Sequence, residues 1–167
     1  MKRKNTPDAV DLLDADHLAV HAMFEQYREL VRSGAAALAR RTLAEDLCLA
    51  LTIHAKLEQE LFYPAVRDAL QDEDLVDESE DQHGSMRDLV GQILTGKPED
   101  ELYDAKVAVL CEYVERHVRQ EREQVFNRLL ASGIDLQSLG RRIARRREEL
   151  RSVADALRED ALAQATA

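Results

Sequence analysis

The sequence contains one pattern of metal-binding residue types twice: a single histidine, a long spacer and then His-x-x-x-Glu. The first copy consists of His17, His54 and Glu58, and the second consists of His83, His117 and Glu121. Positions i and i+4 lie on one face of a helix, so each His-Glu pair can point both side chains at one ion. Imidazole and carboxylate ligands without thiolate suit iron, manganese or zinc. The pattern therefore predicts a metal site built from two similar halves.

The two halves also match in the residues that precede each His-Glu pair. The same shift along the sequence that carries His54 onto His117 carries Cys48 onto Cys111. Such self-similarity indicates a repeated helical unit. Both cysteines fall about 120° from the ligand direction on a helix, so we expect small buried apolar side chains rather than redox groups.

Composition predicts one helix-rich globular domain. The chain has 167 residues, of which 34% are charged, with 6 Gly and 3 Pro. No apolar run follows the basic N-terminus, so we expect neither a signal peptide nor a spanning helix, and we expect a cytoplasmic protein with reduced thiols. The formal net charge of −10 argues against binding to nucleic acid or to an anionic membrane surface.

Apolar periodicity predicts four long helices. We expect them over about 8–31, 37–70, the region between Gln71 and Gly96, and 98–132. Pro64 should kink or locally break the second helix. Gln71 to Asp81 is strongly acidic, which suits a turn leading into the start of the third helix.

A fifth, Arg-rich helix is expected from about Asp135. We expect it to pack Leu139, Ile143 and Leu150 across the bundle and to expose its charges, rather than to bind a partner or nucleic acid. The chain then divides into a flexible N-terminus at 1–7, a bundle at 8–133, and an Arg-rich helix and tail at 134–167.

Turn positions test whether the six side chains can meet. In an antiparallel bundle with short loops, residues on consecutive helices lie level when the turn is midway between them. The midpoint of His17 and His54 falls at residues 34–36, that of Glu58 and His83 near 71, and that of His83 and His117 at 100. All three lie on or beside expected turns. The sequence therefore predicts an all-α, up-down-up-down four-helix bundle with all six side chains in one layer.

The number of donors in this layer favours two ions. Six protein ligands exceed the four of a tetrahedral zinc site, and two carboxylates can bridge ions about 3.5 to 4 Å apart. The remaining positions would be open to oxo or hydroxo bridges and an exogenous ligand. The alternative, histidines and glutamates on solvated or hydrogen-bonded helix faces, is disfavoured because a buried glutamate is costly unless it is paired or coordinated.

Other polar residues could assist the six. His21 lies one turn after His17 but about 40° round the helix, so we expect either a histidine on the flank of the helix or one that orients a ligand, rather than a ligand itself. Asp14 and Glu80 each stand three residues before a single histidine. Glu80 could bind metal or orient His83, or it could be a solvated residue in an acidic stretch.

Tyr113 precedes His117 by one turn on the same face. It could hydrogen-bond a ligand, donate to bound oxygen or coordinate as phenolate, or it could be a core tyrosine.

The segments DADHLAVHAMF, HAKLEQELFYP, EDQHGSM and HVRQEREQVF resemble the four ligand helices of the hemerythrin-like, HHE cation-binding family, over about residues 10–131. The resemblance implies a four-helix bundle with a non-haem di-iron centre that interacts with O2 or related molecules. It also implies that His17, His54, Glu58, His83, His117 and Glu121 are the ligands. Two iron ions, oxo- or hydroxo-bridged, are then the expected cofactor, with manganese or zinc less favoured.

Two departures set this chain apart from oxygen-carrying hemerythrins. Those proteins have a second histidine four residues after the third-helix histidine, where this chain has Arg87, and they end with His-x4-Asp instead of His117-x3-Glu121. We therefore expect a protein that binds or senses O2, NO or peroxide, or iron itself, rather than an oxygen carrier. A di-iron enzyme that consumes peroxide or oxidises a small substrate is the alternative. Iron storage and iron–sulfur repair are weaker alternatives.

Overall fold

The structure, a computed structural model, describes residues 6–166, and every element in that range is helical. Residues 1–5 of the segment expected to be flexible lie outside the described range. The elements are α1 (Ala9–Arg32), α2 (Ala37–Leu57), the π-helix η1 (Glu58–Phe62), α3 (Tyr63–Leu70), α4 (Glu73–Thr95), α5 (Tyr103–Gln120), the π-helix η2 (Glu121–Phe126), α6 (Asn127–Ser132), α7 (Leu136–Ser152) and α8 (Ala154–Thr166). No helix among these residues is both long and apolar enough to cross a membrane.

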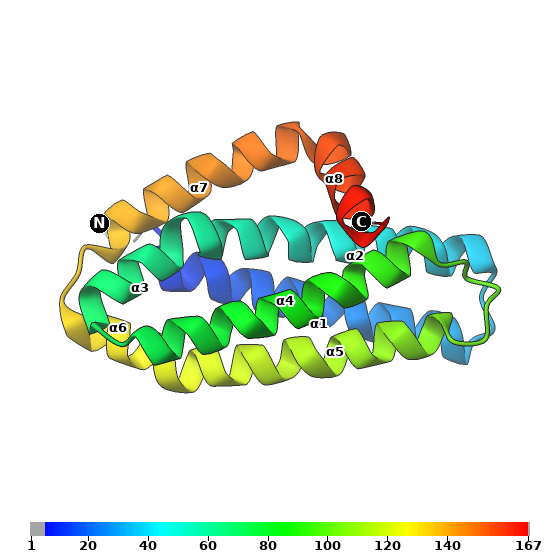
Figure 1. The fold of residues 1–167 in the computed structure, drawn as a ribbon, viewed down its shortest axis with the longest axis horizontal. Coiled ribbons are helices and arrows are strands. Elements are labelled where there is room, and N and C mark those ends of the chain that lie inside the picture. The colour runs from blue at the N-terminus through cyan, green and yellow to red at the C-terminus, as the bar shows by residue number, and fades with distance from the viewer. Residues whose placement is uncertain (1–5, 167) are drawn as a thin grey trace, which may run out of the picture.

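Four antiparallel arms form the bundle (Figure 1). They are α1, the continuous run α2–η1–α3, α4, and the continuous run α5–η2–α6. The up-down-up-down bundle with additional C-terminal helical structure is confirmed. The helical run continues through Pro64, and the local irregularity expected there is the π-helical segment η1, which ends just before it.

Local chemistry explains where the arms begin and end. Asp8 and Asp11 form a reciprocal capping box at the start of α1. The second arm ends at Gln71 and the fourth at Gly133, both in the left-handed region, with φ of 52° and 78°. The fourth arm starts later than expected. Residues 98–102 form turns, and the helix begins at Tyr103, the first buried residue of its apolar stripe.

Two apolar clusters lie on either side of a polar layer in the bundle. The first comprises Ala9, Leu13, Leu57, Phe62, Tyr63, Val66, Leu75, Val76, Val125, Phe126, Leu129, Leu139, Ile143, Leu150 and Leu157. The second comprises Val20, Phe24, Tyr27, Ala44, Leu47, Cys48, Leu51, Val90, Ile93, Tyr103, Val107, Leu110, Cys111, Val114 and Val118. Cys48 and Cys111 are free thiols, each 1% exposed, so the expectation of buried small side chains is confirmed. The polar layer is thus screened from solvent along the bundle axis.

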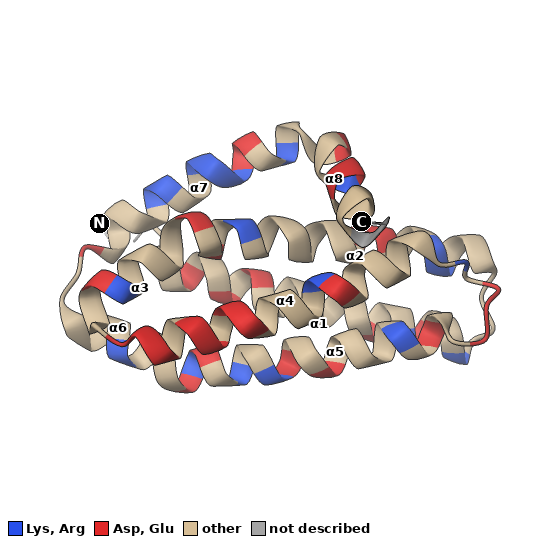
Figure 2. Ribbon diagram, viewed as in Figure 1, with Lys and Arg blue, Asp and Glu red and all other residues tan. Residues whose placement is uncertain are grey.

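The C-terminal segment forms two helices instead of one, because the chain bends at Val153. α7 packs on α1 and α2, and α8 turns back onto α4 and α2 (Figure 1). Leu139, Ile143 and Leu150 face the bundle as expected. The approach is close at Gly140, where a Cβ atom would lie 2.9 Å from the backbone at the start of α1. Figure 2 shows basic residues along α7 and acidic residues along the first half of α4.

Candidate metal centre

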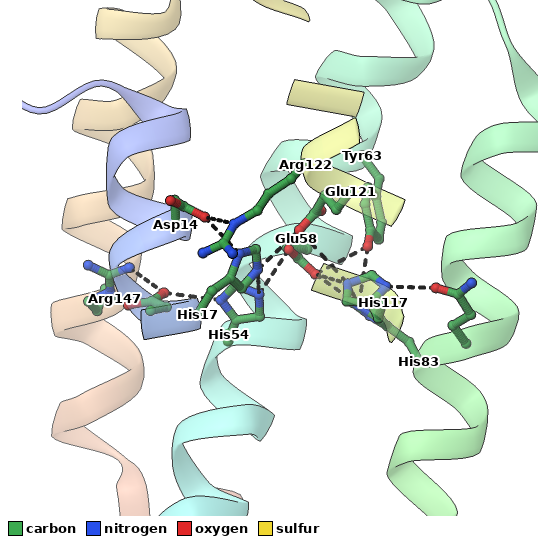
Figure 3. Close-up of polar contacts among 12 residues, drawn as sticks. Asp14, His17, His54, Glu58, Tyr63, His83, His117, Glu121, Arg122 and Arg147 are labelled. Atoms are coloured by element: carbon green, nitrogen blue, oxygen red, sulfur yellow. Dashed lines mark hydrogen bonds and ion pairs between the residues drawn. The ribbon is translucent and has the colours of Figure 1, made fainter. Parts of the chain in front are cut away.

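The four arms bring all six sequence-predicted side chains into the polar layer (Figure 3). None is more than 7% exposed. α1 supplies His17, α2 and η1 supply His54 and Glu58, α4 supplies His83, and α5 and η2 supply His117 and Glu121. The level arrangement inferred from the turn positions therefore agrees with the structure.

The six side chains form two groups that share one carboxylate. Ligand atoms of His17, His54, Glu58 and Glu121 all lie within 4.8 Å of one another, and so do those of Glu58, His83 and His117. Glu58 Oε1 is 2.9 Å from His54 Nε2, and its Oε2 is 2.8 Å from His83 Nε2. Glu121 Oε2 lies 3.1 Å from His17 Nε2 and 3.9 Å from His117 Nε2. Glu58 thus stands between two histidine pairs.

Both glutamates stand at the first residue of a π-helical segment. Pro64 follows η1, but no proline follows η2, so proline is not their common cause. π-helical turns inside α-helices occur frequently at functional sites because they re-aim side chains. Their recurrence at the matching glutamate of each repeat indicates that the local backbone serves the cluster.

The ring nitrogens that face away from the centre are held by polar partners. Asp14 Oδ1 lies 3.3 Å from Nδ1 of His17, and Asp16 Oδ2 lies 3.1 Å from Nδ1 of His54. In both rings a proton on Nδ1 would be donated to the carboxylate, which leaves the Nε2 lone pair directed into the cluster.

The other histidine pair has weaker support. Gln82 Oε1 accepts from His117 Nδ1 at 2.9 Å, while Nδ1 of His83 has no hydrogen-bond partner within residues 6–166. Three of the four rings are therefore oriented by an acceptor outside the cluster.

The donor set fits bound cations. The Nε2 atoms of His17 and His54 are 3.2 Å apart, and those of His83 and His117 are 3.3 Å apart. Two nitrogens held about 2.1 Å from one ion at angles near 90 to 110° would lie roughly 3.0 to 3.4 Å apart. Paired lone pairs repel unless a proton or metal ion lies between them. The spacing and direction of the histidines therefore suit one ion per pair.

The carboxylates lead to the same conclusion. Within the described residues, Glu58 Oε1 and both Glu121 oxygens are buried without a hydrogen-bond partner, although imidazole nitrogens lie close by. Their close neighbours are not directed for hydrogen bonding, as expected for atoms that face a common point. Buried carboxylates in this state are costly unless a cation is present.

Burial and neighbouring charges shift the pKa values in the cluster. Burial lowers the pKa of His54, but Glu58 and Asp16 outweigh it and raise that pKa to about 10. Burial raises the pKa of Glu58, yet the three nearest histidines hold it well below its usual range. Burial and the neighbouring Glu58 raise the pKa of Glu121. The anionic form of Glu58 is therefore strongly favoured, whereas the anionic form of Glu121 needs an added positive charge nearby to offset its burial and the charge of Glu58.

Tyr63 is a member of the site that sequence reasoning missed. Its buried hydroxyl donates to Glu58 Oε2 at 3.2 Å and lies 3.1 Å from His83 Nε2. In a regular helix Tyr63 would point about 140° away from Glu58, but the π-helical backbone of η1 lies between them and alters that angle. Burial and Glu58 raise the pKa of the Tyr63 hydroxyl.

Three residues that we considered as possible supports of the cluster lie outside it. The side chain of His21 is 57% exposed and faces Glu115. Glu80 faces Arg67 on the surface, 3.9 Å away, because it lies on the solvent side of α4. Tyr113 is 39% exposed and carries Arg116 over its ring, so it is neither a ligand partner nor a core residue. The stripe that seemed to include Tyr113 is narrower than the sequence pattern suggested.

A cavity of about 250 Å³ opens beside the cluster. All four clustered histidines border it, apolar side chains form much of its wall, and α8 covers it. The wall includes Val20, Leu51, Met86, Val90, Val114 and Val118, and the cover includes Leu157, Asp160, Ala161 and Gln164. A small molecule in this cavity would reach the histidine side of the centre.

Comparison with known proteins agrees with this geometry. The family model of the hemerythrin HHE cation-binding domain matches residues 8–129, which include all six clustered residues. The chain belongs to the hemerythrin HHE cation-binding family. The crystal structure of a hemerythrin HHE cation-binding domain-containing protein from Mycobacterium kansasii has the same fold, with a TM-score of 0.75 and 20% identity over 94% of this chain and 100% of that chain. No curated protein matches the sequence significantly. The family and the His/Glu cluster together identify a metal-binding hemerythrin-like protein.

Proposed function

We propose that this hemerythrin-like protein holds two iron ions and binds or senses a small ligand such as O2, NO or peroxide. The observation that carries the proposal is the pair of histidine groups joined by Glu58, with a cavity on the histidine side. Two histidines and a carboxylate, with further positions open, suit non-haem iron better than tetrahedral zinc. Iron bound there would supply exchangeable coordination positions and one-electron redox change.

The chain's own residues would perform the remaining tasks. Asp14, Asp16 and Gln82 orient histidine rings, and Tyr63 donates a hydrogen bond to the shared Glu58. The apolar cavity wall would limit water around an incoming ligand, which strengthens polar interactions at the centre. The free thiols Cys48 and Cys111 suit a reducing compartment, and we propose a cytoplasmic location.

Metal analysis tests the proposal directly. After iron-replete expression we expect about two irons per chain and an iron-dependent absorption in the near ultraviolet, as a two-metal donor set implies. His54→Ala and Glu121→Ala should lower the iron content and weaken this absorption, while His21→Ala, which changes an exposed histidine, should leave both unchanged. A folded wild-type protein without iron, or a His54→Ala variant with unchanged iron, would refute the proposal.

The size of the cavity favours a second candidate, a di-iron enzyme acting on peroxide or a small organic molecule. A volume of about 250 Å³ exceeds the roughly 30 Å³ share of one water molecule several-fold, so the space is larger than a diatomic ligand needs. Peroxide added to the iron-loaded protein separates the candidates. Sustained turnover supports the enzyme, whereas one stoichiometric spectral change supports binding or sensing.

A further inference from the structure

One histidine of the centre is connected to α7, which lies outside the region that matches the family model. Arg147 donates from Nη2 to Asp16 Oδ2 at 2.6 Å, and the same oxygen lies 3.1 Å from Nδ1 of His54 (Figure 3). The side chain of Arg147 is 12% exposed and that of Asp16 is 22% exposed. The C-terminal segment therefore reaches the metal centre through a largely shielded chain of two contacts.

The position of Arg147 is fixed by packing. Ile143 and Leu150, on either side of it in sequence, are 0% and 2% exposed in the core, and Gly140 allows α7 to touch the start of α1. Neighbouring arginines on α7 form ion pairs at the protein surface instead. Arg146 pairs with acidic residues at the rim of the bundle, and Arg151 pairs with the exposed Glu148 on its own helix.

The matching position in the other half lacks this connection. Asp16 stands just before His17 and reaches His54, and Gln82 stands just before His83 and reaches His117. Gln82 donates onward to the Gln120 amide, not to an ionic partner. Only the first of these matched contacts is therefore a carboxylate held by an arginine within the described chain.

We propose that Arg147 is a positioning residue of the metal centre: it holds Asp16 against His54 and so fixes the orientation of that ring and the hydrogen bond that its Nδ1 donates. The inference rests on the proposed di-iron function. A carboxylate at Nδ1 makes an imidazole a stronger metal ligand, and partners of this kind change metal affinity about 10- to 100-fold. A stronger donor favours ferric over ferrous iron, so loss of the contact should raise the reduction potential.

Two measurements on Arg147→Met test the proposal, one of them without metal. In the iron-free protein, NMR of the histidine rings should show an Nδ1–H of His54 that is hydrogen-bonded and exchanges slowly with solvent in the wild type, and faster exchange of this proton in Arg147→Met and Asp16→Asn. In the iron-loaded protein both variants should raise the reduction potential. A tenfold change in the ferric-to-ferrous affinity ratio equals about 59 mV for one electron. Arg147→Lys should restore part of each effect.

Matched variants separate this role from general destabilisation. Arg151→Met, on the exposed side of the same helix, should leave both readouts unchanged. Adding Arg147→Met to Asp16→Asn should change neither readout further, because Arg147 acts through Asp16. The proposal is overturned if Arg147→Met folds and leaves the exchange of the His54 Nδ1 proton and the reduction potential unchanged, lowers the potential, or acts equally in the Asp16→Asn background. A wild type without iron would defeat the proposed function, while the NMR result would still test the contact.

Discussion

Glu121 provides a sharp test of why the polar layer exists. It is 1% exposed, and neither carboxylate oxygen has a hydrogen-bond partner among the described residues. Its Oε2 faces His17 Nε2 at 3.1 Å without hydrogen-bond direction, and burial together with Glu58 raises its pKa. In the iron-free protein this side chain should therefore cost stability. Glu121→Met replaces it with an apolar chain of similar length, which can fill the space without a large void.

The expected gain can be estimated from the missing partners. An unsatisfied buried polar group costs about 1 to 3 kcal/mol, and replacement of buried charged groups by packed apolar ones gains about 1 to 4 kcal/mol. We expect iron-free Glu121→Met to be more stable than the iron-free wild type by about 1 to 3 kcal/mol. The same change removes a ligand of the ion held by His17 and His54, so it should remove the stabilisation that this one ion provides, which is about 2.7 kcal/mol at a free concentration 100 times Kd.

Urea denaturation of the iron-free and iron-loaded proteins measures both effects, and an unchanged m-value would show that the unfolding reaction is the same. Glu58→Met is the matched control. Glu58 accepts from Tyr63 and faces His54 and His83, so its removal leaves partners unpaired and should lower the stability of the iron-free protein. If Glu121→Met were no more stable than the wild type, or if both substitutions had equal effects, the view of Glu121 as a residue retained for metal at the expense of stability would be wrong.

The remaining predictions concern the two ion positions, the pH dependence of metal binding and the packing of α7 on α1. His17→Ala and His83→Ala, each in a different ligand group, should each lower iron from about two to about one per chain by metal analysis, and an equal loss of both ions in both variants would contradict separate positions. The raised pKa of His54, about 10, means that the iron-free ring is positively charged at pH 7 and that metal must displace one of its two protons. Titration with iron should therefore release protons, and the affinity for iron should fall as pH falls. Gly140→Ala should destabilise the protein by about 1 to 3 kcal/mol in urea, because its Cβ would meet the backbone of α1 at 2.9 Å, whereas the exposed Ser152→Ala should have little effect.

The bundle could be predicted because its signals are local and repeated. Apolar periodicity and the breaks near Gly34, Gln71 and Gly133 place three of the four arms closely. The predicted start of the fourth arm is several residues too early, because Pro98 and the acidic residues after it resemble a helix start. In the structure these residues form hydrogen-bonded backbone turns instead. The bend at Val153 has no glycine or proline to announce it. The bend depends on the packing of α8 against α4 and α2, which are distant in sequence, so the local sequence does not predict it.

Whether a side chain could be predicted to face the metal centre depends on whether the helix is regular at that residue. The ligands meet this condition and Tyr63 does not. The i, i+4 spacing holds for His54 and Glu58 because the helix is regular up to Glu58. Beyond that residue the backbone becomes π-helical, and the 100° rule no longer tells which side chains point inward. For Tyr113 the helix is regular, and the prediction of an inward-facing side chain is wrong for a different reason. Tyr113 lies at the edge of the buried stripe and is exposed.

The repeat fixes where the ligands lie, and the residues just before each single histidine decide how the two halves differ. Asp14 orients His17, but its counterpart Glu80 faces Arg67 and leaves His83 Nδ1 without a partner in the described chain. At the next matched pair of positions, the contact to the opposite histidine is a carboxylate in one half and an amide in the other. A carboxylate strengthens the imidazole as a donor more than an amide does. A duplicated helical pair can therefore keep one ligand geometry while the two ions experience different donor strength, and that inequality comes from charge at matched positions rather than from a change in the fold.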